Sequence, residues 1–401
     1  MEAEQRAPQV ISSRVTAALL ACGMFMPVGL FAPSLVLPQL GRSFAGVAHA
    51  EMLTELVGAL ASFAFAVASP AAGAVIARLG CRRVIATALI LFAVGGALPA
   101  LLNNIWLILV ARVGVGIALA AVFTGALVGL GSFPGEQRNR MFGWFSVVGG
   151  VTAIFLFPVV AAIGQYGWRP AFLVNLSALL VIPLVLQLPE ALGTVAAKKS
   201  PIDSEGKQST GRLVGPAMAG LLAIASLTGM AMLISPIYAP IHLAELGLSD
   251  TRLMAMPATL GATLAVFASA SYGQLHARIG TESVFALGLL LAAAMLVIAG
   301  ISTTATIFVA AVVILSATTA MLAPNVSAAA MAYGPLGKGP QAIGLANGVM
   351  FGAQIAFPFI ALWVRARAGM AGLFLSFGAV FFVAAISVVL LASRWRRRSA
   401  G

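Results

Sequence analysis

The sequence predicts an all-α integral membrane protein. Hydrophobic residues make up 61% of the 401-residue chain and charged residues only 8%, whereas a soluble domain carries roughly 25% charged residues. The apolar residues are gathered into runs of about 20, the length of a membrane-spanning helix. A segment in lipid must satisfy its own backbone hydrogen bonds, and the runs lack the alternation of β-barrel strands, so we expect helices.

The apolar runs number twelve along the chain. Six lie before residue 190, at approximately 15–38, 52–77, 84–102, 105–131, 141–164 and 170–189. Six more follow, at approximately 213–240, 253–277, 284–301, 303–331, 342–364 and 370–393. We therefore expect twelve transmembrane helices in two six-helix halves, residues 1–189 and 213–401, the second with a basic tail. The polar, turn-rich stretch 190–212 is expected to form a flexible cytoplasmic linker.

Repeated residues indicate that the six-helix unit is duplicated. The loops after the second and eighth runs share four residues at one spacing, Gly73, Ala77, Arg78 and Gly80 in the first and Gly273, Ala277, Arg278 and Gly280 in the second. Phe157-Pro158 recurs as Phe357-Pro358 at the same offset. Several matches in register are the signature of an internal repeat.

Loop charges predict the orientation in the membrane. With the N-terminus inside, 17 of the 23 Lys and Arg residues fall on the cytoplasmic side and 5 on the opposite side, while Arg112 lies within a helix. This excess follows the positive-inside rule and predicts that both termini are cytoplasmic. The net charge of +12 is scattered through loops and the tail, so no nucleic-acid partner is expected.

The residues do not form a pattern for catalysis or metal binding. His49, His242 and His276 are isolated in the sequence, and Cys22 and Cys81 lack zinc-ligand spacing. No nucleophile and base stand in a catalytic arrangement. The sequence therefore predicts neither an enzyme nor a bound cofactor or metal.

The loop after the second run resembles the signature of the major facilitator superfamily, Gly-x-Leu-Ala-Asp-Arg-x-Gly-Arg-(Lys/Arg). Gly73, Arg78, Gly80 and Arg82 match it, and its second copy supplies Gly273, Arg278 and Gly280. Ala77, Cys81 and, in the second copy, Ala277 depart from it. In the family the missing Asp belongs to a latch that closes the cytoplasmic side. The resemblance therefore implies a gating role for the matching residues and puts the usual latch in doubt.

Two residues are candidates for coupling transport to protons. Arg112 lies inside the fourth apolar run, where an ionisable side chain is a functional candidate by default. With Gly116 it resembles the family's helix-4 motif Arg-x-x-x-Gly-x-Gly, whose Arg is implicated in proton movement. The alternative is that Arg112 snorkels to the membrane surface. Glu55, at the outer start of the second run, is the best carboxylate candidate, and a solvated helix end is its alternative.

The resemblance also places helices 1, 4, 7 and 10 around a central cavity, with helices 5, 8 and 11 contributing. Met and Phe side chains form an adaptable apolar wall, and a few amides orient a ligand. The candidates for contacting substrate are Phe25, Met26, Tyr238, Asn325, Asn347 and Gln354.

The resemblance implies a secondary transporter that works by alternating access. We expect proton-coupled efflux of a small amphipathic organic compound by a monomer in a bacterial inner membrane, with lipid, protons and the small molecule as partners. One alternative is uptake of an organic anion, with Arg112 as counter-ion. A second alternative, from another class, is a membrane sensor or scaffold without flux.

Overall fold

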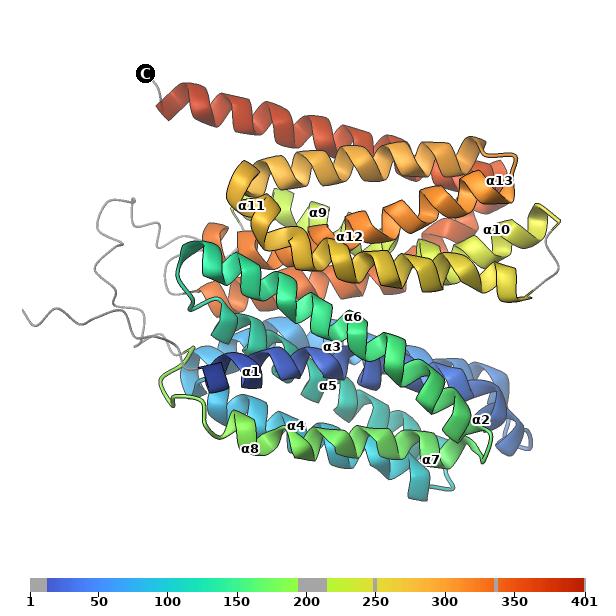
Figure 1. The fold of residues 1–401 in the computed structure, drawn as a ribbon. Coiled ribbons are helices and arrows are strands. Elements are labelled where there is room, and N and C mark those ends of the chain that lie inside the picture. Colours follow the sequence, from blue (N-terminus) through green and yellow to red (C-terminus); the bar gives the residue numbers. More distant parts are fainter. Residues whose placement is uncertain (1–12, 194–214, 248–250, 335–337, 400–401) are drawn as a thin grey trace, which may run out of the picture.

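A computed structural model describes residues 13–193, 215–247, 251–334 and 338–399. All regular elements in these ranges are helical, with no strand among them (Figure 1). Ten helical segments in the described ranges are long and apolar enough to cross a membrane. The prediction of an all-α integral membrane protein is therefore confirmed.

The first predicted helix is irregular. It comprises α1 (Ser13–Ala21), a 3-10 turn (Cys22–Met24), a π-helical turn (Pro27–Phe31), a second 3-10 segment (Ala32–Val36) and α2 (Leu37–Ser43). Pro27, Pro33 and Pro38 lie along this path. Because proline has no N–H to donate, the α-helical hydrogen-bond pattern is interrupted and 3-10 and π turns replace it.

The rest of the first set of helices is more regular. It consists of α3 (Ala50–Leu79), α4 (Cys81–Ala97), α5 (Ile105–Leu130), α6 (Gly135–Gly164), α7 (Trp168–Phe172), a 3-10 segment (Leu173–Leu180) and α8 (Ile182–Val185). Gly80 alone separates α3 from α4, with φ of 81° and ψ of 162°. Other residue types are strained in this conformation, so glycine makes the sharp turn possible.

The second set repeats these features. It consists of α9 (Pro216–Ala231), a π-helical turn (Ile234–Tyr238), α10 (Ala239–Glu245), α11 (Thr251–Ile301), α12 (Ala305–Tyr333) and α13 (Gly339–Ser399). The long helices α11 and α13 each contain one non-helical residue, Gly280 with φ of 77° and Gly369 with φ of 68°. Figure 1 shows the chain reversing direction within each of them. If α11 and α13 each cross the membrane twice, the ten membrane-capable segments give the predicted twelve crossings. The number of crossings and the cytoplasmic location of both termini stay predictions.

The two sets of helices occupy different parts of the bundle. In Figure 1 the elements before residue 194 lie below those after residue 214, and the sets meet where α3 packs on α13 and α6 packs on α11. Residues 194–214, which include most of the predicted linker, lie outside the described residues. The predicted division into halves at 190–212 therefore stays a prediction.

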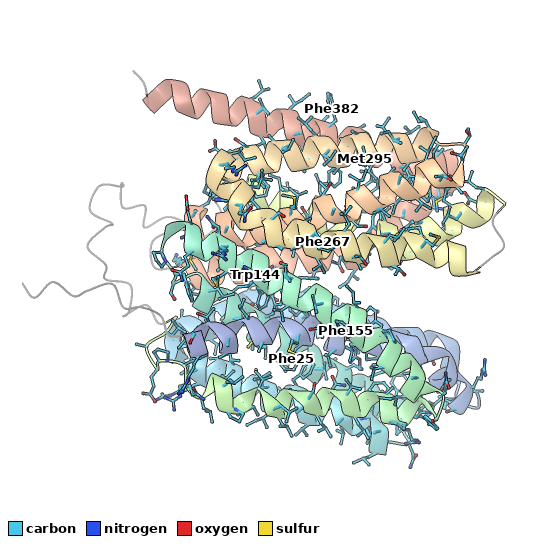
Figure 2. The ribbon with its side chains drawn as sticks, in the orientation of Figure 1. Phe25, Trp144, Phe155, Phe267, Met295 and Phe382 are labelled. Atoms are coloured by element: carbon cyan, nitrogen blue, oxygen red, sulfur yellow. The ribbon has the colours of Figure 1, made fainter. Side chains whose placement is uncertain are left out.

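Large apolar side chains cover the exterior of the bundle. Phe155, Phe267 and Phe382 are between 50% and 71% exposed, and Figure 2 shows them on three different helices. A soluble protein rarely exposes apolar surface on this scale, whereas a membrane-facing surface requires it. The fold is thus that of a multi-pass membrane protein.

Candidate functional site

The two sets of helices pack closely at one end of the bundle, on the left of Figure 1, where α11 reverses at Gly280. We call this the glycine-loop end, because it carries the turns at Gly80 and Gly280. Their backbone angles are nearly the same, with φ of 81° and 77°. The repeat seen in the sequence is therefore a repeat of backbone conformation.

Two seams of glycine join the sets at this end. In the first, between α3 and α13, Gly73 lies against the backbone of Pro340 and Gly344 against the Ser69 carbonyl oxygen. In the second, between α6 and α11, a methyl group added at Gly273 would lie 2.6 Å from Arg140 Cα. Such contacts exist only where both backbones approach without a side chain between them. The predicted gating glycines Gly73 and Gly273 thus occupy equivalent places in the two seams.

A polar contact also bridges the second seam. Asn139 of α6 donates from Nδ2 to His276 Nδ1 of α11 (2.9 Å), and His276 Nε2 lies 2.8 Å from Thr281 Oγ1. Because the amide nitrogen can only donate, Nδ1 accepts and Nε2 carries the proton given to Thr281. Ala277, where the family has Asp, is exposed beside it. A neutral histidine therefore bridges the two sets of helices near the position of the missing acid.

The arginines of the glycine loops lie mainly at the surface. Arg78 and Arg278 are exposed, while Arg82 and Arg83 lie 3.4 and 3.9 Å from the carboxylate of Glu190. The Glu190 side chain is 65% exposed, and exposed ion pairs contribute roughly 0–1 kcal/mol. These pairs orient the loop after α8 against α4 and add little to stability.

Arg112 of α5 is fully buried, with 0% exposure. Its Nε donates to the Val57 carbonyl of α3 (2.9 Å), and its Nη2 donates to the Gly29 carbonyl (2.8 Å). The Gly29 carbonyl lacks its α-helical donor because the residue four positions later is Pro33. Snorkelling to the membrane surface is therefore wrong as an interpretation of Arg112.

The position of Arg112 depends on close packing between α5 and α3. Gly116, one turn after Arg112, lies against the Ala61 carbonyl, and a methyl group there would lie 2.7 Å from Ala64 Cβ. Arg112 Nη1 is buried and has no hydrogen-bond partner among the described residues. Burying a cation with an unpaired donor is costly, so Arg112 stays a candidate for a functional role. Glu55 lies in α3, but its side chain is outside the described part of the structure.

The six substrate candidates are mostly packed inside the bundle. Phe25, Met26, Tyr238, Asn325 and Asn347 are buried, and only Gln354 is partly exposed. Phe25 packs edge-on against Phe92, with ring centroids 5.4 Å apart. Asn325 bonds the Tyr272 hydroxyl (3.1 Å) and the Thr281 carbonyl (3.0 Å). It therefore supports the turn at Gly280.

The remaining candidates have local partners. Tyr238 packs on Phe357 with centroids 5.0 Å apart. The Asn347 amide donates to the carbonyl one turn before it, leaving its buried Oδ1 without a partner among the described residues. Gln354 Nε2 lies 3.8 Å from Met232 Sδ, joining α13 to the chain after α9. Gln354 and Asn347 thus keep hydrogen-bonding capacity for a ligand.

An aromatic cluster between the two sets was missed by sequence reasoning. Phe65, Phe123 and Phe145 come from α3, α5 and α6, and Phe351 comes from α13. The Phe65 and Phe351 centroids are 4.9 Å apart, and those of Phe123 and Phe145 are 5.1 Å apart. Phe351 precedes Gln354 by three residues on the same helix, which is the one sequence signal for its location.

A charged cluster at the opposite end was also missed. His242 of α10 has Nδ1 3.2 Å from Glu245 Oε2, and Glu245 Oε1 lies 3.5 Å from Arg365 Nη2 of α13. The spacing of His242 and Glu245, three residues apart, places both on one face of a helix. That spacing was present in the sequence, whereas Arg365 is too distant along the chain to be paired from it.

These features define a class of protein: a multi-pass helical membrane protein in which two sets of helices meet through glycine seams around a buried arginine. The family model of the Major Facilitator Superfamily matches residues 17–283. This chain belongs to that family of transporters, and its class is secondary transport rather than catalysis. A search of curated protein sequences gave no significant match.

Solved structures share the fold. The proton:xylose symporter XylE, bound to 6-bromo-6-deoxy-D-glucose, gives a TM-score of 0.79 at 16% identity over 93% of this chain and 94% of its own. The human organic anion transporter MFSD10 gives 0.74 at 18% identity over 94% and 99%. The E. coli fucose:proton symporter FucP gives 0.70 at 16% identity over 93% and 98%. At these identities the likeness concerns the fold alone.

Proposed function

We propose that this transporter exports a small amphipathic organic compound from a bacterial cytoplasm, driven by protons and working as a monomer in the inner membrane. The observation that carries the proposal is the buried Arg112, which ties α5 to Gly29 and Val57 of two neighbouring helices. Because Arg112 bonds carbonyls of two other helical segments, a relative movement of these segments would break or form its hydrogen bonds. Alternating access then exposes the central region to each side in turn.

The loop charges support a cytoplasmic location for the glycine-loop end. Among the Lys and Arg residues with described side chains in or next to loops, eight lie at that end and four at the other: Arg14, Arg78, Arg82, Arg83, Arg138, Arg140, Arg278 and Lys338 against Arg42, Arg169, Arg365 and Arg367. Positive residues are retained on the cytoplasmic side. With the two glycine seams in contact, the described conformation is then closed to the cytoplasm.

The central aromatic and thioether side chains support an amphipathic cargo. Phe123, in the first set of helices, is partly exposed within the aromatic cluster. In the second set, the side chain of Gln354 contacts that of Met232. Polarizable side chains accept varied apolar shapes, and one amide orients a polar group. We propose that the cargo lies between Phe123 and Gln354, with Arg112 and Glu55 in the coupling pathway.

One observation favours a second candidate, the uptake of an organic anion. Arg112 Nη1 has a free donor among the described residues, and MFSD10, an organic anion transporter, shares the fold. The cargo carboxylate would then accept from Nη1. A sensor or scaffold without flux remains the alternative if no compound is moved.

The proposed export is tested by substrate-triggered proton movement in energised inside-out vesicles. The panel comprises amphipathic cations, amphipathic neutral compounds and organic anions, and vesicles carrying Arg112→Ala are the control. Proton release on addition of an amphipathic compound, absent in the control, is the expected result. Responses only to anions would favour the second candidate. No response in vesicles that contain the folded protein would contradict proton-driven export.

A further inference from the structure

One ring nitrogen of His242 has a hydrogen-bond partner among the described residues, and the other has none. It is 7% exposed and lies in α10, with Nδ1 3.2 Å from Glu245 Oε2. A carboxylate oxygen accepts, so Nδ1 carries the proton in the neutral ring. His242 Nε2 is then a bare lone pair, and it is buried with no hydrogen-bond partner among the described residues. A buried acceptor without a donor is unfavourable, and Nε2 is the nitrogen at which this ring can take up a second proton.

The surroundings of His242 suit a cation better than a neutral ring. The centroids of Phe308 on α12 and Phe374 on α13 lie 4.7 and 5.4 Å from the imidazole centroid. Both distances are within the roughly 6 Å range of cation–π attraction. The Glu245 carboxylate supplies the opposite charge. An imidazolium at His242 therefore has a carboxylate on one side and two aromatic rings around it.

Solvent reaches this site through Glu245, whose side chain is 46% exposed. The same carboxylate is also held by Arg365 Nη2 of α13 at 3.5 Å. Glu245 and Arg365 together carry no net charge, so a proton on His242 makes the cluster positive. Arg365 and the His242 proton thus compete for one carboxylate, and a proton is favoured when Arg365 is displaced.

Few other charged groups face His242. On the packed elements α12 and α13, the described charges at this end are Arg365 and Arg367, and the preceding π-helical turn contributes the Tyr238 hydroxyl. Arg252, near the start of α11, has its side chain outside the described residues. Two residues before Arg365, the Trp363 ring lies 4.1 Å below the guanidinium of Arg367. Arg367 is thus a nearby cation held by a different partner.

We propose that His242 and Glu245 form a proton-binding site whose occupancy controls the contact between α10 and α13. The proton is exchanged with water at this end of the bundle and is held on His242 Nε2, and it is released when Arg365 reclaims the carboxylate. Helix α10 is joined to the preceding chain by the π-helical turn Ile234–Tyr238, and such turns are frequent at functional sites. Protonation draws Glu245 away from Arg365 and so weakens the ionic contact between α10 and α13, which opens the end of the bundle opposite the glycine-loop end.

This proposal goes beyond proton-driven export, since the site binds a proton whether or not transport is driven by one. It is tested without a substrate by ¹⁵N NMR of histidine-labelled protein in lipid nanodiscs. The chain has three histidines, so His49→Asn and His276→Gln assign the spectrum. We expect His242 to hold its proton on Nδ1 at high pH and to gain one on Nε2 as the pH is lowered.

Variants of Glu245 and Arg365 test whether the two residues shift the His242 titration in opposite directions. Glu245→Gln removes the stabilising carboxylate and should move the His242 titration to lower pH. Arg365→Gln removes the competing cation and should move it to higher pH. Arg367→Gln, the matched control, should leave it unchanged. A His242 that keeps one protonation state throughout, or a titration insensitive to Glu245 and Arg365, would overturn the proposal.

The separation of α10 from α13 is measured by double electron–electron resonance between spin labels at Ile241 of α10 and Leu362 of α13. The labels are placed in a variant that lacks Cys22 and Cys81. We expect longer distances at low pH in the parent protein. His242→Gln, or His242→Phe where the aromatic shape is needed for folding, should abolish this pH dependence. Equal pH responses in the parent and both variants would show that the proton on His242 does not move α10.

Discussion

The contact between Gly273 of α11 and Arg140 of α6 yields the sharpest prediction. A methyl group at residue 273 would lie 2.6 Å from Arg140 Cα and 2.9 Å from Arg140 Cβ, whereas ordinary contacts lie at 3.4–4 Å. Gly273→Ala must therefore separate α6 and α11 by about 1 Å or distort their backbones. Overpacking of this kind costs about 1–3 kcal/mol. Because the strain exists only while the seam is closed, it should favour opening of the glycine-loop end by about 5-fold to 150-fold.

Distance measurements between spin labels test this shift. Labels at Thr87 of α4 and Gln274 of α11, both exposed and on different sets of helices, report separation at the glycine-loop end. We expect a longer-distance population in Gly273→Ala and not in Gly220→Ala. Gly220 lies in α9 with no atom within 4 Å of an added methyl group, so this control shares the gain in helix propensity without the clash. Identical distance distributions in both variants would refute the reasoning.

Three further predictions concern the polar groups. Arg112→Lys keeps the positive charge, but an ammonium group cannot reach both the Val57 and the Gly29 carbonyl as the planar guanidinium does. We therefore expect folded protein whose gradient-driven transport is reduced at least tenfold. Parent-like transport rates in vesicles would show that the two guanidinium hydrogen bonds are not needed for transport. Glu55→Gln should flatten the pH dependence of transport, and an unaltered profile would exclude the carboxylate. His276→Leu removes one bond across the second seam, about 1 kcal/mol, and should open the glycine-loop end about fivefold in the spin-label assay; no increase would argue against the bridge.

The sequence predicted the features that depend on local pattern. The apolar runs located the membrane helices, and the spacing of Gly80 and Gly280 located two turns whose φ values are 81° and 77°. Such features follow from composition and from the conformational freedom of glycine. Arg112 was identified for the same reason, since one charge in an apolar run is conspicuous.

The sequence could not predict which side of a helix faces which neighbour. Tyr238 and Asn325 lie on helices that the family places around the cavity, yet Tyr238 packs on Phe357 and Asn325 supports the turn at Gly280. The bond between Asn139 and His276 joins residues 137 positions apart. Nothing local marks such a pair, because it exists only through the packing of α6 on α11. The irregular first and seventh helices also read as continuous apolar runs.

Transport by alternating access requires the two sets of helices to separate at the glycine-loop end. Asn139 and His276, which touch across the second seam, are replaced by cysteines in a background without Cys22 and Cys81, and the pair is joined with a short, reducible thiol cross-linker. Single-cysteine variants receive the same reagent as controls. We predict that cross-linking stops transport of any compound found active in the vesicle panel and that reduction restores it. Undiminished transport by fully cross-linked protein would contradict alternating access at this seam.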